Sequence, residues 1–338
     1  MDVAKWIELS KTNNVLHLRD MNLYVLPELS PTLEQLWCEH NHLTGLPNLP
    51  STLTTLFCDS NILTGLPPLP DSLEILECSE NQITSLPHPL PESLQNLICR
   101  NNQLEDLPPL PPKLGLLRCS ENRIDSVLYF PTTLEEVECD HNLLTKLPPL
   151  PEGLYKLHCE HNRITILPSL PDALVELVCD SNQLSSLPKL PQGLEILHCG
   201  HNRLSSFPLL PTSLTEVYAS NNPLREPFLS LYRTYIEDDD ISQFLTSVNY
   251  YLTEQARKAN IRNQARTLRN LHVTSQQGFE ELPNNIRLHI GSTVSGKVGK
   301  TLRNQLQQMK QNHNEYGPRR QRIQRRQRKT RKQKDRNI

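Results

Sequence analysis

The sequence predicts a solenoid, in which one short parallel strand from each repeat stacks on the next to form a single extended sheet. Three observations support this prediction: a period of 20 residues, a cysteine at the same place in nine copies, and an asparagine three residues after each cysteine. In the first clear copy, residues 33–52, the pattern is L-x-x-L-x-C-x-x-N-x-L-x-x-L-P-x-L-P-x-x. One such repeat cannot bury its own apolar face, so successive repeats must stack.

The repeated cysteine accounts for all nine cysteines of the chain. Their spacing is 20 residues, except for one spacing of 21 where His88-Pro89 adds a residue. A further copy has Ala219 in the cysteine position, and a degenerate first copy begins at Leu16. We therefore expect about eleven repeats over residues 16–225.

Within each repeat, residue type alternates as it does in a half-buried strand. Leu36 and Cys38 alternate with Trp37 and Glu39, which predicts two side chains pointing into the core and two pointing outward. The asparagine follows where the chain leaves the strand, and its amide offers donors and an acceptor to backbone groups freed by the turn. We predict that these side chains form a structural ladder. They are Asn41, Asn61, Asn81, Asn102, Asn122, Asn142, Asn162, Asn182, Asn202 and Asn222.

The second half of each repeat, L-P-x-L-P, predicts the convex side of the solenoid. Proline fixes φ, removes an amide donor and disfavours helix in the residue before it. Two prolines in four residues therefore exclude a helix there. The convex side should be extended or polyproline-like.

The period and its motif are those of leucine-rich-repeat solenoids, the α/β horseshoe class. The L-P-x-L-P ending resembles the LPX subclass found in bacterial type III secreted effectors, over residues 16–225. Some members of that family append a ubiquitin-ligase domain with a catalytic cysteine. The present sequence has no cysteine after Cys199, so the resemblance implies a non-enzymatic binding solenoid without that domain.

Helices are predicted on both sides of the repeats. Residues 1–15 form an N-terminal cap, with a short helix over 2–11 that Asp2 begins. Residues 226–316 form a helical C-terminal region, with apolar residues at helical spacing over 228–236 and from Ile241 to about Leu271. We expect these helices to cover the open end of the solenoid.

The outward residues of the strands, here called the concave face, are the predicted binding surface. Aromatic and apolar groups beside carboxylates on a rigid sheet are typical of surfaces that bind a protein partner. The predicted contact residues are Trp37, Phe57, Glu77, Ile98, Arg118, Glu138, His158, Val178, His198 and Tyr218.

Histidines on the same face raise the alternative of a metal site, since His158, Glu160, His161, His198 and His201 come from neighbouring repeats. Polar residues are expected in these columns in any case, and the sequence has no C-x-x-C or C-x-x-H pair. We predict no metal site. Residues 286–301 resemble a phosphate-binding loop but fail its spacing, so we predict no cofactor and no enzyme activity.

Charge is divided unevenly along the chain. Residues 1–225 contain 13 Lys and Arg and 27 Asp and Glu, a net charge of −14, whereas residues 226–338 contain 22 and 10, a net charge of +12. Residues 317–338 are a strongly basic tail, expected to be disordered and to contact a nuclear-import receptor or nucleic acid, or to act only as a solubilising segment. Its basic residues include Arg319, Arg320, Arg322, Arg325, Arg326, Arg328, Lys329, Arg331 and Lys332.

Two alternatives to a pathogen scaffold that binds a host protein stay open. Residues 279–290 loosely resemble an F-box, which would make the chain a substrate adaptor of a ubiquitin ligase. The basic tail favours instead a structural protein of a virion or one associated with nucleic acid. The partner's identity and the oligomeric state are not predicted.

The predicted location is an intracellular, reducing compartment. The sequence has no apolar run long enough to span a membrane and no N-x-[ST] acceptor, and its odd number of cysteines occupies one repeated position. For a pathogen product this means the host cytoplasm or nucleus. A virion is the alternative.

Overall fold

The computed structural model of the chain describes residues 14–236 and 240–278 and, in the last helix, side chains as far as residue 263. The predicted helix over residues 2–11 lies outside this described part, as do residues 279–290, residues 286–301 and the basic tail. The described residues up to 257 form one compact unit, and residues 258–278 continue the last helix.

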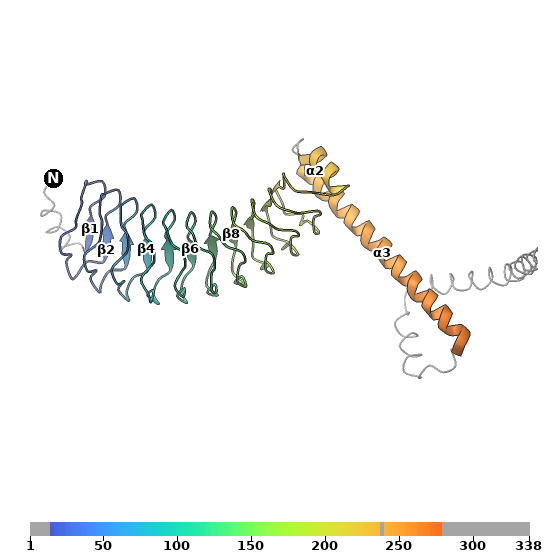
Figure 1. The fold of residues 1–338 in the computed structure, drawn as a ribbon, viewed down its shortest axis with the longest axis horizontal. Helices are drawn as coiled ribbons and strands as arrows, with labels where there is room; N and C mark the ends of the chain where they lie inside the picture. Colours follow the sequence, from blue (N-terminus) through green and yellow to red (C-terminus); the bar gives the residue numbers. More distant parts are fainter. Residues whose placement is uncertain (1–13, 237–239, 279–338) are drawn as a thin grey trace, which may run out of the picture. The chain divides into compact units, whose positions relative to one another are not determined.

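Eleven parallel strands form one sheet in the order of the sequence, as predicted. Each strand has three residues and pairs in register with the strand one repeat away (Figure 1). The strands are β1 Val15–His17, β2 Gln35–Trp37, β3 Thr55–Phe57, β4 Ile75–Glu77, β5 Asn96–Ile98, β6 Leu116–Arg118, β7 Glu136–Glu138, β8 Lys156–His158, β9 Glu176–Val178, β10 Ile196–His198 and β11 Glu216–Tyr218.

The core is a stack of leucine and cysteine side chains. In the first clear repeat, Leu33, Leu36, Cys38 and Leu43 are all fully buried. The same positions are buried in the following repeats, so one continuous apolar cluster runs through the solenoid. Burial of each such leucine contributes about 1.5–3 kcal/mol, which explains why the repeats stack rather than fold singly.

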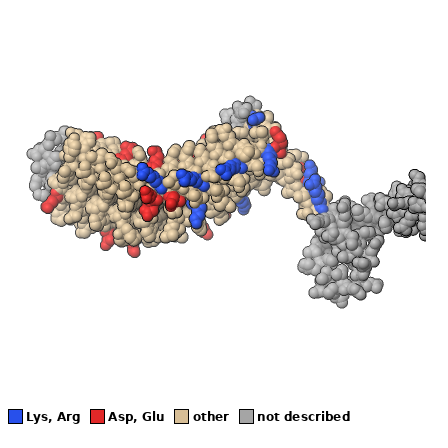
Figure 2. All heavy atoms as spheres, in the orientation of Figure 1, with Lys and Arg blue, Asp and Glu red and all other residues tan. Residues whose placement is uncertain are grey.

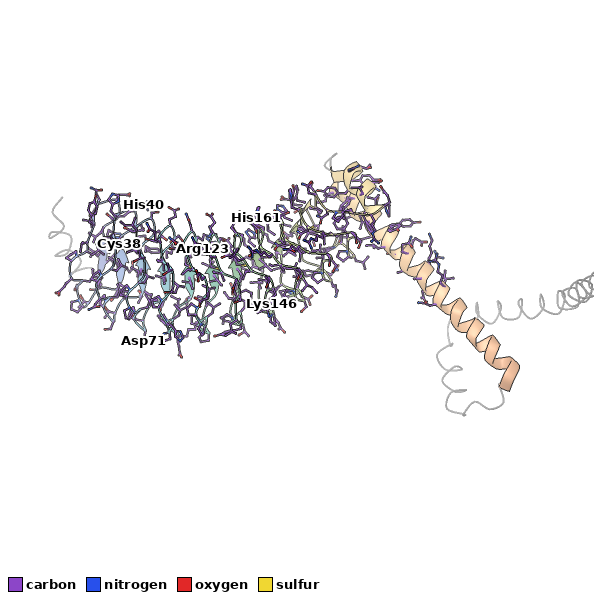
Figure 3. All side chains as sticks on the ribbon, viewed as in Figure 1. Cys38, His40, Asp71, Arg123, Lys146 and His161 are labelled. Carbon is purple, nitrogen blue, oxygen red and sulfur yellow. The ribbon has the colours of Figure 1, made fainter. Side chains whose placement is uncertain are left out.

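The chain leaves each strand through a left-handed residue, followed by the asparagine. The backbone φ is 53° at His40, and it is positive at the equivalent residue of each following repeat. The Asn142 Nδ2 donates to the carbonyl oxygens of Cys119, Cys139 and Asp140, and its Oδ1 accepts from the amide of Ile124. Each asparagine therefore joins its own repeat to the one before it. In Figure 3, His40 and His161 lie along one edge of the solenoid, and Asp71 and Lys146 along the other.

The L-P-x-L-P segments contain neither helix nor strand, as their prolines predict. The repeat that departs from this motif, residues 127–131, keeps its inward position because Phe130 is buried where a leucine stands elsewhere. Its Tyr129 hydroxyl donates to the Leu110 carbonyl oxygen at 2.7 Å, while Leu128 is 79% exposed. The departure therefore leaves the stacking intact.

Two helices follow the repeats, α2 Phe228–Ile236 and α3 Ile241–Gly278, as predicted from their apolar spacing. Asp240 begins α3, since its Oδ1 accepts from the amide of Gln243 at 3.0 Å. Buried aromatic rings from both helices, Phe228 and Phe244, pack edge-on against Phe207 of the last repeats. No helix in the described part is long and apolar enough to cross a membrane.

The helices also satisfy backbone groups at the end of the repeats. The Tyr232 hydroxyl accepts from the amide of Ala219, the residue in the cysteine position of the last strand. The Asn249 side chain accepts from the Leu210 amide and donates to the Leu210 carbonyl oxygen, at 2.9 and 2.7 Å. The start of the helical region thus closes the C-terminal end of the sheet.

Candidate functional site

Three parallel columns of side chains make up the concave face. Its columns contain the first residue of each strand, the third residue, and the residue that follows each cysteine. In the first clear repeat these are Gln35, Trp37 and Glu39. The register of the sheet places equivalent residues side by side, for example Trp37 beside Phe57 and Phe57 beside Glu77.

An aromatic stack lies at the N-terminal end of this face. The rings of His17, Trp37 and Phe57 follow one another, with centroid distances of 5.2 Å and 4.4 Å. Both Trp37 and Phe57 are half-buried by this stacking. Within the described part of the chain, the buried Trp37 Nε1 has no hydrogen-bond partner.

Three carboxylates, here called the acidic cluster, stand beside the aromatic stack: Glu39, Asp59 and Glu77. Glu39 is only 6% exposed, and its buried Oε2 finds no partner among the described residues. Burial raises the pKa of Asp59, and the nearby Glu39 raises it further, although a 2.7 Å hydrogen bond from the Ser79 amide opposes this. Burial, Asp59 and Glu39 likewise raise the pKa of Glu77.

Basic residues are scarce around the acidic cluster. Residues 14–99 contain ten Asp and Glu but one Lys or Arg, which is Arg19. Arg19 lies 3.3 Å from the carboxylate of Asp20, and Arg118, two strands beyond Glu77, lowers the Glu77 pKa only partly. On the face shown in Figure 2, Lys and Arg appear only from the middle of the repeats onward.

In the middle of the concave face, by contrast, carboxylates are paired with bases. These residues are here called the central network. Glu136 and Glu138, both nearly fully buried, lie between three cations. The Arg118 guanidinium donates to Glu136 at 2.7 and 2.9 Å, the Lys156 Nζ donates to Glu138 at 2.8 Å, and Arg100 pairs with Glu138. Burial favours a higher Glu136 pKa, but the bonds from Arg118 and the charge of Lys156 hold that pKa below its usual value.

The C-terminal end of the face has paired histidines. His158 Nε2 lies 2.7 Å from Glu176, and His198 Nε2 lies 2.6 Å from Glu216. The ring of His198 meets Tyr218 edge-on, with centroids 6.0 Å apart.

Comparisons with known proteins agree with this architecture. Neither a protein-family model nor a curated protein sequence matches the chain. Among solved structures, the APL1 leucine-rich repeat domain is 24% identical over 63% of this chain and 64% of that chain, with a TM-score of 0.53. This chain has the leucine-rich-repeat fold. The repeat pattern, the single parallel sheet and this likeness lead to the same conclusion.

Two further similar structures are proteins called YopM. YopM from Yersinia enterocolitica is 35% identical over 61% of this chain, with a TM-score of 0.43. YopM from Yersinia pestis, described as a leucine-rich effector protein, is 27% identical over 66% of this chain, with a TM-score of 0.44. The chain spans 55% of the first protein and 88% of the second.

The ten predicted contact residues differ in how far a partner can reach them. Glu138 and Val178 are buried, at 5% and 9% exposure. Glu138 is covered because long side chains from adjacent leucine-rich repeats close over it, whereas Tyr218 is 39% exposed on the last strand. The other contact residues are half-buried.

Sequence reasoning missed the first column of the concave face. This column supplies Glu136 and Lys156 to the central network and Glu176 and Glu216 to the paired histidines. The two-residue alternation that places Trp37 outward also places the residue two positions earlier outward, so the signal was present in the sequence. The column is Val15, Gln35, Thr55, Ile75, Asn96, Leu116, Glu136, Lys156, Glu176, Ile196 and Glu216.

The histidines considered for a metal site have different partners in the structure. His141 and His161 stack face to face with centroids 4.1 Å apart, and burial together with His141 lowers the pKa of His161. His158 and His198 each bind a separate glutamate. No group of three or more metal-ligating side chains occurs in the residues that the structure describes.

All nine cysteines are buried and free. Several thiols donate to the carbonyl oxygen of the next strand, as in Cys179 to His198 at 3.2 Å. Burial raises the pKa of each thiol above its usual value, which keeps the thiols protonated and poorly nucleophilic. The cysteines therefore act as small core residues of the leucine-rich repeats.

Proposed function

We propose that the chain is a non-enzymatic scaffold that binds another protein through the concave face. The aromatic stack carries this proposal. Trp37 and Phe57 present partly exposed rings on a sheet whose repeats are joined by the asparagine side chains. Large aromatic groups on a rigid surface contribute much of the binding energy of protein interfaces.

The rigidity of the concave face favours binding because few of its side chains have to become ordered when a partner binds. Each ring is already held by its neighbour, and each strand is fixed in register by the strands on both sides. A partner therefore loses less free energy to ordering these side chains than it would on a mobile loop. His198 and Tyr218 offer a second, smaller aromatic contact at the other end.

The finer proposal is that the chain is a pathogen product and that its partner is a host protein. The L-P-x-L-P repeats support it through their resemblance to secreted effectors. A ubiquitin-ligase adaptor and a nucleic-acid-associated protein remain the competing hypotheses, because the segments on which they depend lie outside the described residues.

The test is capture of partners from a host-cell lysate by the full chain and by two double variants. Trp37→Ala with Phe57→Ala truncates the aromatic stack, whereas Leu128→Ala with Leu209→Ala truncates equally apolar side chains that are 79% and 61% exposed away from the strands. A protein partner should be lost with the first variant and kept with the second, while both variants keep the unfolding midpoint of a folded solenoid.

Equal capture by both variants would place binding outside the aromatic stack and contradict the proposal. Capture of a ligase scaffold or of nucleic acid, unchanged by either variant, would favour one of the competing hypotheses.

A further inference from the structure

The acidic cluster differs from the central network in the charges that surround its carboxylates. In the central network the same kind of side chain is met by Arg100, Arg118 and Lys156. Glu39, Asp59 and Glu77 instead come from the neighbouring repeats of β2, β3 and β4. Glu39 raises the pKa of both Asp59 and Glu77, Asp59 also raises the pKa of Glu77, and the Glu39 Oε2 has no partner among the described residues. Among the described residues, Arg118 acts on Glu77 from two strands away and no base pairs with the cluster.

The aromatic stack supplies the second requirement for a cation. Trp37 belongs to the same strand end as Glu39, and Phe57 stands between Trp37 and Glu77 in the column. A guanidinium or ammonium group is attracted to the face of an aromatic ring, most strongly to tryptophan, and the attraction increases where water is excluded. Here rings and carboxylates lie within one half-buried surface.

One carboxylate oxygen of the cluster is buried without a hydrogen-bond donor. Glu39 is only 6% exposed, yet its Oε2 accepts no hydrogen bond from the described residues. A buried carboxylate oxygen without a donor is destabilising, and a hydrogen bond to a charged donor would relieve it. Arginine suits this position because its planar group stacks on rings while it donates several hydrogen bonds.

We propose that the N-terminal end of the concave face binds an arginine-rich segment of the partner protein, with a guanidinium between the aromatic stack and the acidic cluster. The proposal rests on the proposed function, since it names the chemistry of the partner at one end of the same surface. Charge complementarity supports it: residues 14–99 carry a net charge of −9, with ten acidic residues and one basic residue.

The chain offers a local probe for this site. It contains two tryptophans, Trp6 and Trp37, so Trp6→Phe leaves Trp37 as the only one. Titration of this full-length variant with an arginine-rich peptide should change the Trp37 fluorescence. The same peptide with citrulline in place of arginine keeps the shape and loses the charge, so it should bind at least about tenfold more weakly.

Two triple variants distinguish the effect of the acidic cluster from the effect of the overall charge. Glu39→Gln, Asp59→Asn and Glu77→Gln neutralise the acidic cluster. Glu28→Gln, Asp71→Asn and Glu92→Gln remove the same charge from exposed positions outside the strands, in the same repeats or the one before. We expect the first triple to weaken binding about tenfold and the second to change it by less than about twofold at moderate salt.

Several outcomes would overturn the proposal. Equal weakening by both triples would show attraction to net charge alone, and equal binding of the citrulline peptide would show that no cation is recognised. Self-association that the first triple abolishes would identify another copy of the chain as the occupant, in place of a partner protein.

The result can also be told apart from failure of the proposed function. If truncation of Trp37 and Phe57 abolishes capture of the natural partner but the arginine-rich peptide does not bind, the scaffold proposal stands and this one fails. If the peptide binds in the expected way and capture is unaffected by that truncation, the scaffold proposal fails and the cation site stands.

Discussion

The first repeats and the middle repeats share one backbone but arrange charge in opposite ways. At β2 to β4, three carboxylates face each other without a matching base, and at β5 to β8, two buried carboxylates are enclosed by three cations. The buried Leu and Cys columns are the same in both regions. The difference shows that the inward residues determine how the repeats stack. The outward residues can carry different charges without changing that stacking.

The central network stabilises the fold, whereas the acidic cluster works against it. Opposite charges in a half-buried face attract, and like charges there repel and lose hydration. Retaining an unfavourable group at a surface suggests a role in binding, because function often opposes local stability. The comparison can be tested with variants in each region, through their effect on the free energy of unfolding. That effect should be equal in the two regions for the asparagines, opposite for the two groups of carboxylates, and dependent on pH for the acidic cluster.

The largest effect should come from the asparagines, and it should be the same in both regions. Asn142→Leu and Asn61→Leu each remove four hydrogen bonds to buried backbone groups. We expect each to lower the free energy of unfolding by about 3 kcal/mol, measured by denaturant titration. A difference between the two larger than about 1 kcal/mol would mean that the regions differ in their backbone as well as in their charge.

The next effect belongs to the central network. Glu138→Gln leaves Arg100 and Lys156 without their carboxylate, so we expect a loss of about 2 kcal/mol, less than for a fully buried pair because the cations are partly exposed. Glu105→Gln, at an exposed position in the same half of the solenoid, is the control and should be neutral. An unchanged unfolding midpoint for Glu138→Gln would show that the network does not stabilise the fold.

Neutralising the acidic cluster should have the opposite sign. Glu39→Gln, Asp59→Asn and Glu77→Gln remove like charges without changing shape, and together they should raise the free energy of unfolding by about 1 kcal/mol. The same denaturant titration measures it, with the exposed triple Glu28→Gln, Asp71→Asn and Glu92→Gln as the control. Destabilisation by the cluster variant would mean that these carboxylates have stabilising partners.

The smallest effect is the pH dependence that the acidic cluster contributes. Burial raises the pKa of Asp59 and Glu77 in the folded state, so the folded state takes up protons more readily than the unfolded state as the pH falls. Their destabilising contribution is therefore present at pH 7 and disappears as the pH falls through the raised pKa values. The pKa of Glu136 is lowered, so its contribution is lost only at still lower pH.

The gain in stability of the cluster triple over the wild-type chain should accordingly be smaller near pH 5 than at pH 7. Unfolding titrations of both proteins at the two pH values measure this difference. A gain that increases toward pH 5 would contradict the raised pKa values.

The period, the strands and the core were predictable from the sequence because every repeat contains the same motif. Leu36, Cys38 and Asn41 recur at fixed spacing, and stacking the repeats in register buries the leucines while leaving an amide at each turn. The two C-terminal helices were predictable from their apolar spacing. The first column of the concave face was missed although the same alternation places it outward, as the pair Glu136 and Lys156 shows.

By itself, the sequence determined the repeat, its register and the inward columns, since these depend on spacing within one chain segment. Only the tertiary structure decided which outward side chains meet, because their partners come from neighbouring strands about 20 residues away. It buried Glu138 under three cations and left Glu39 without one, although both are glutamates at outward positions. The physical reason is that the charge and exposure of a side chain on a sheet are set by the strands beside it, which its own repeat does not specify.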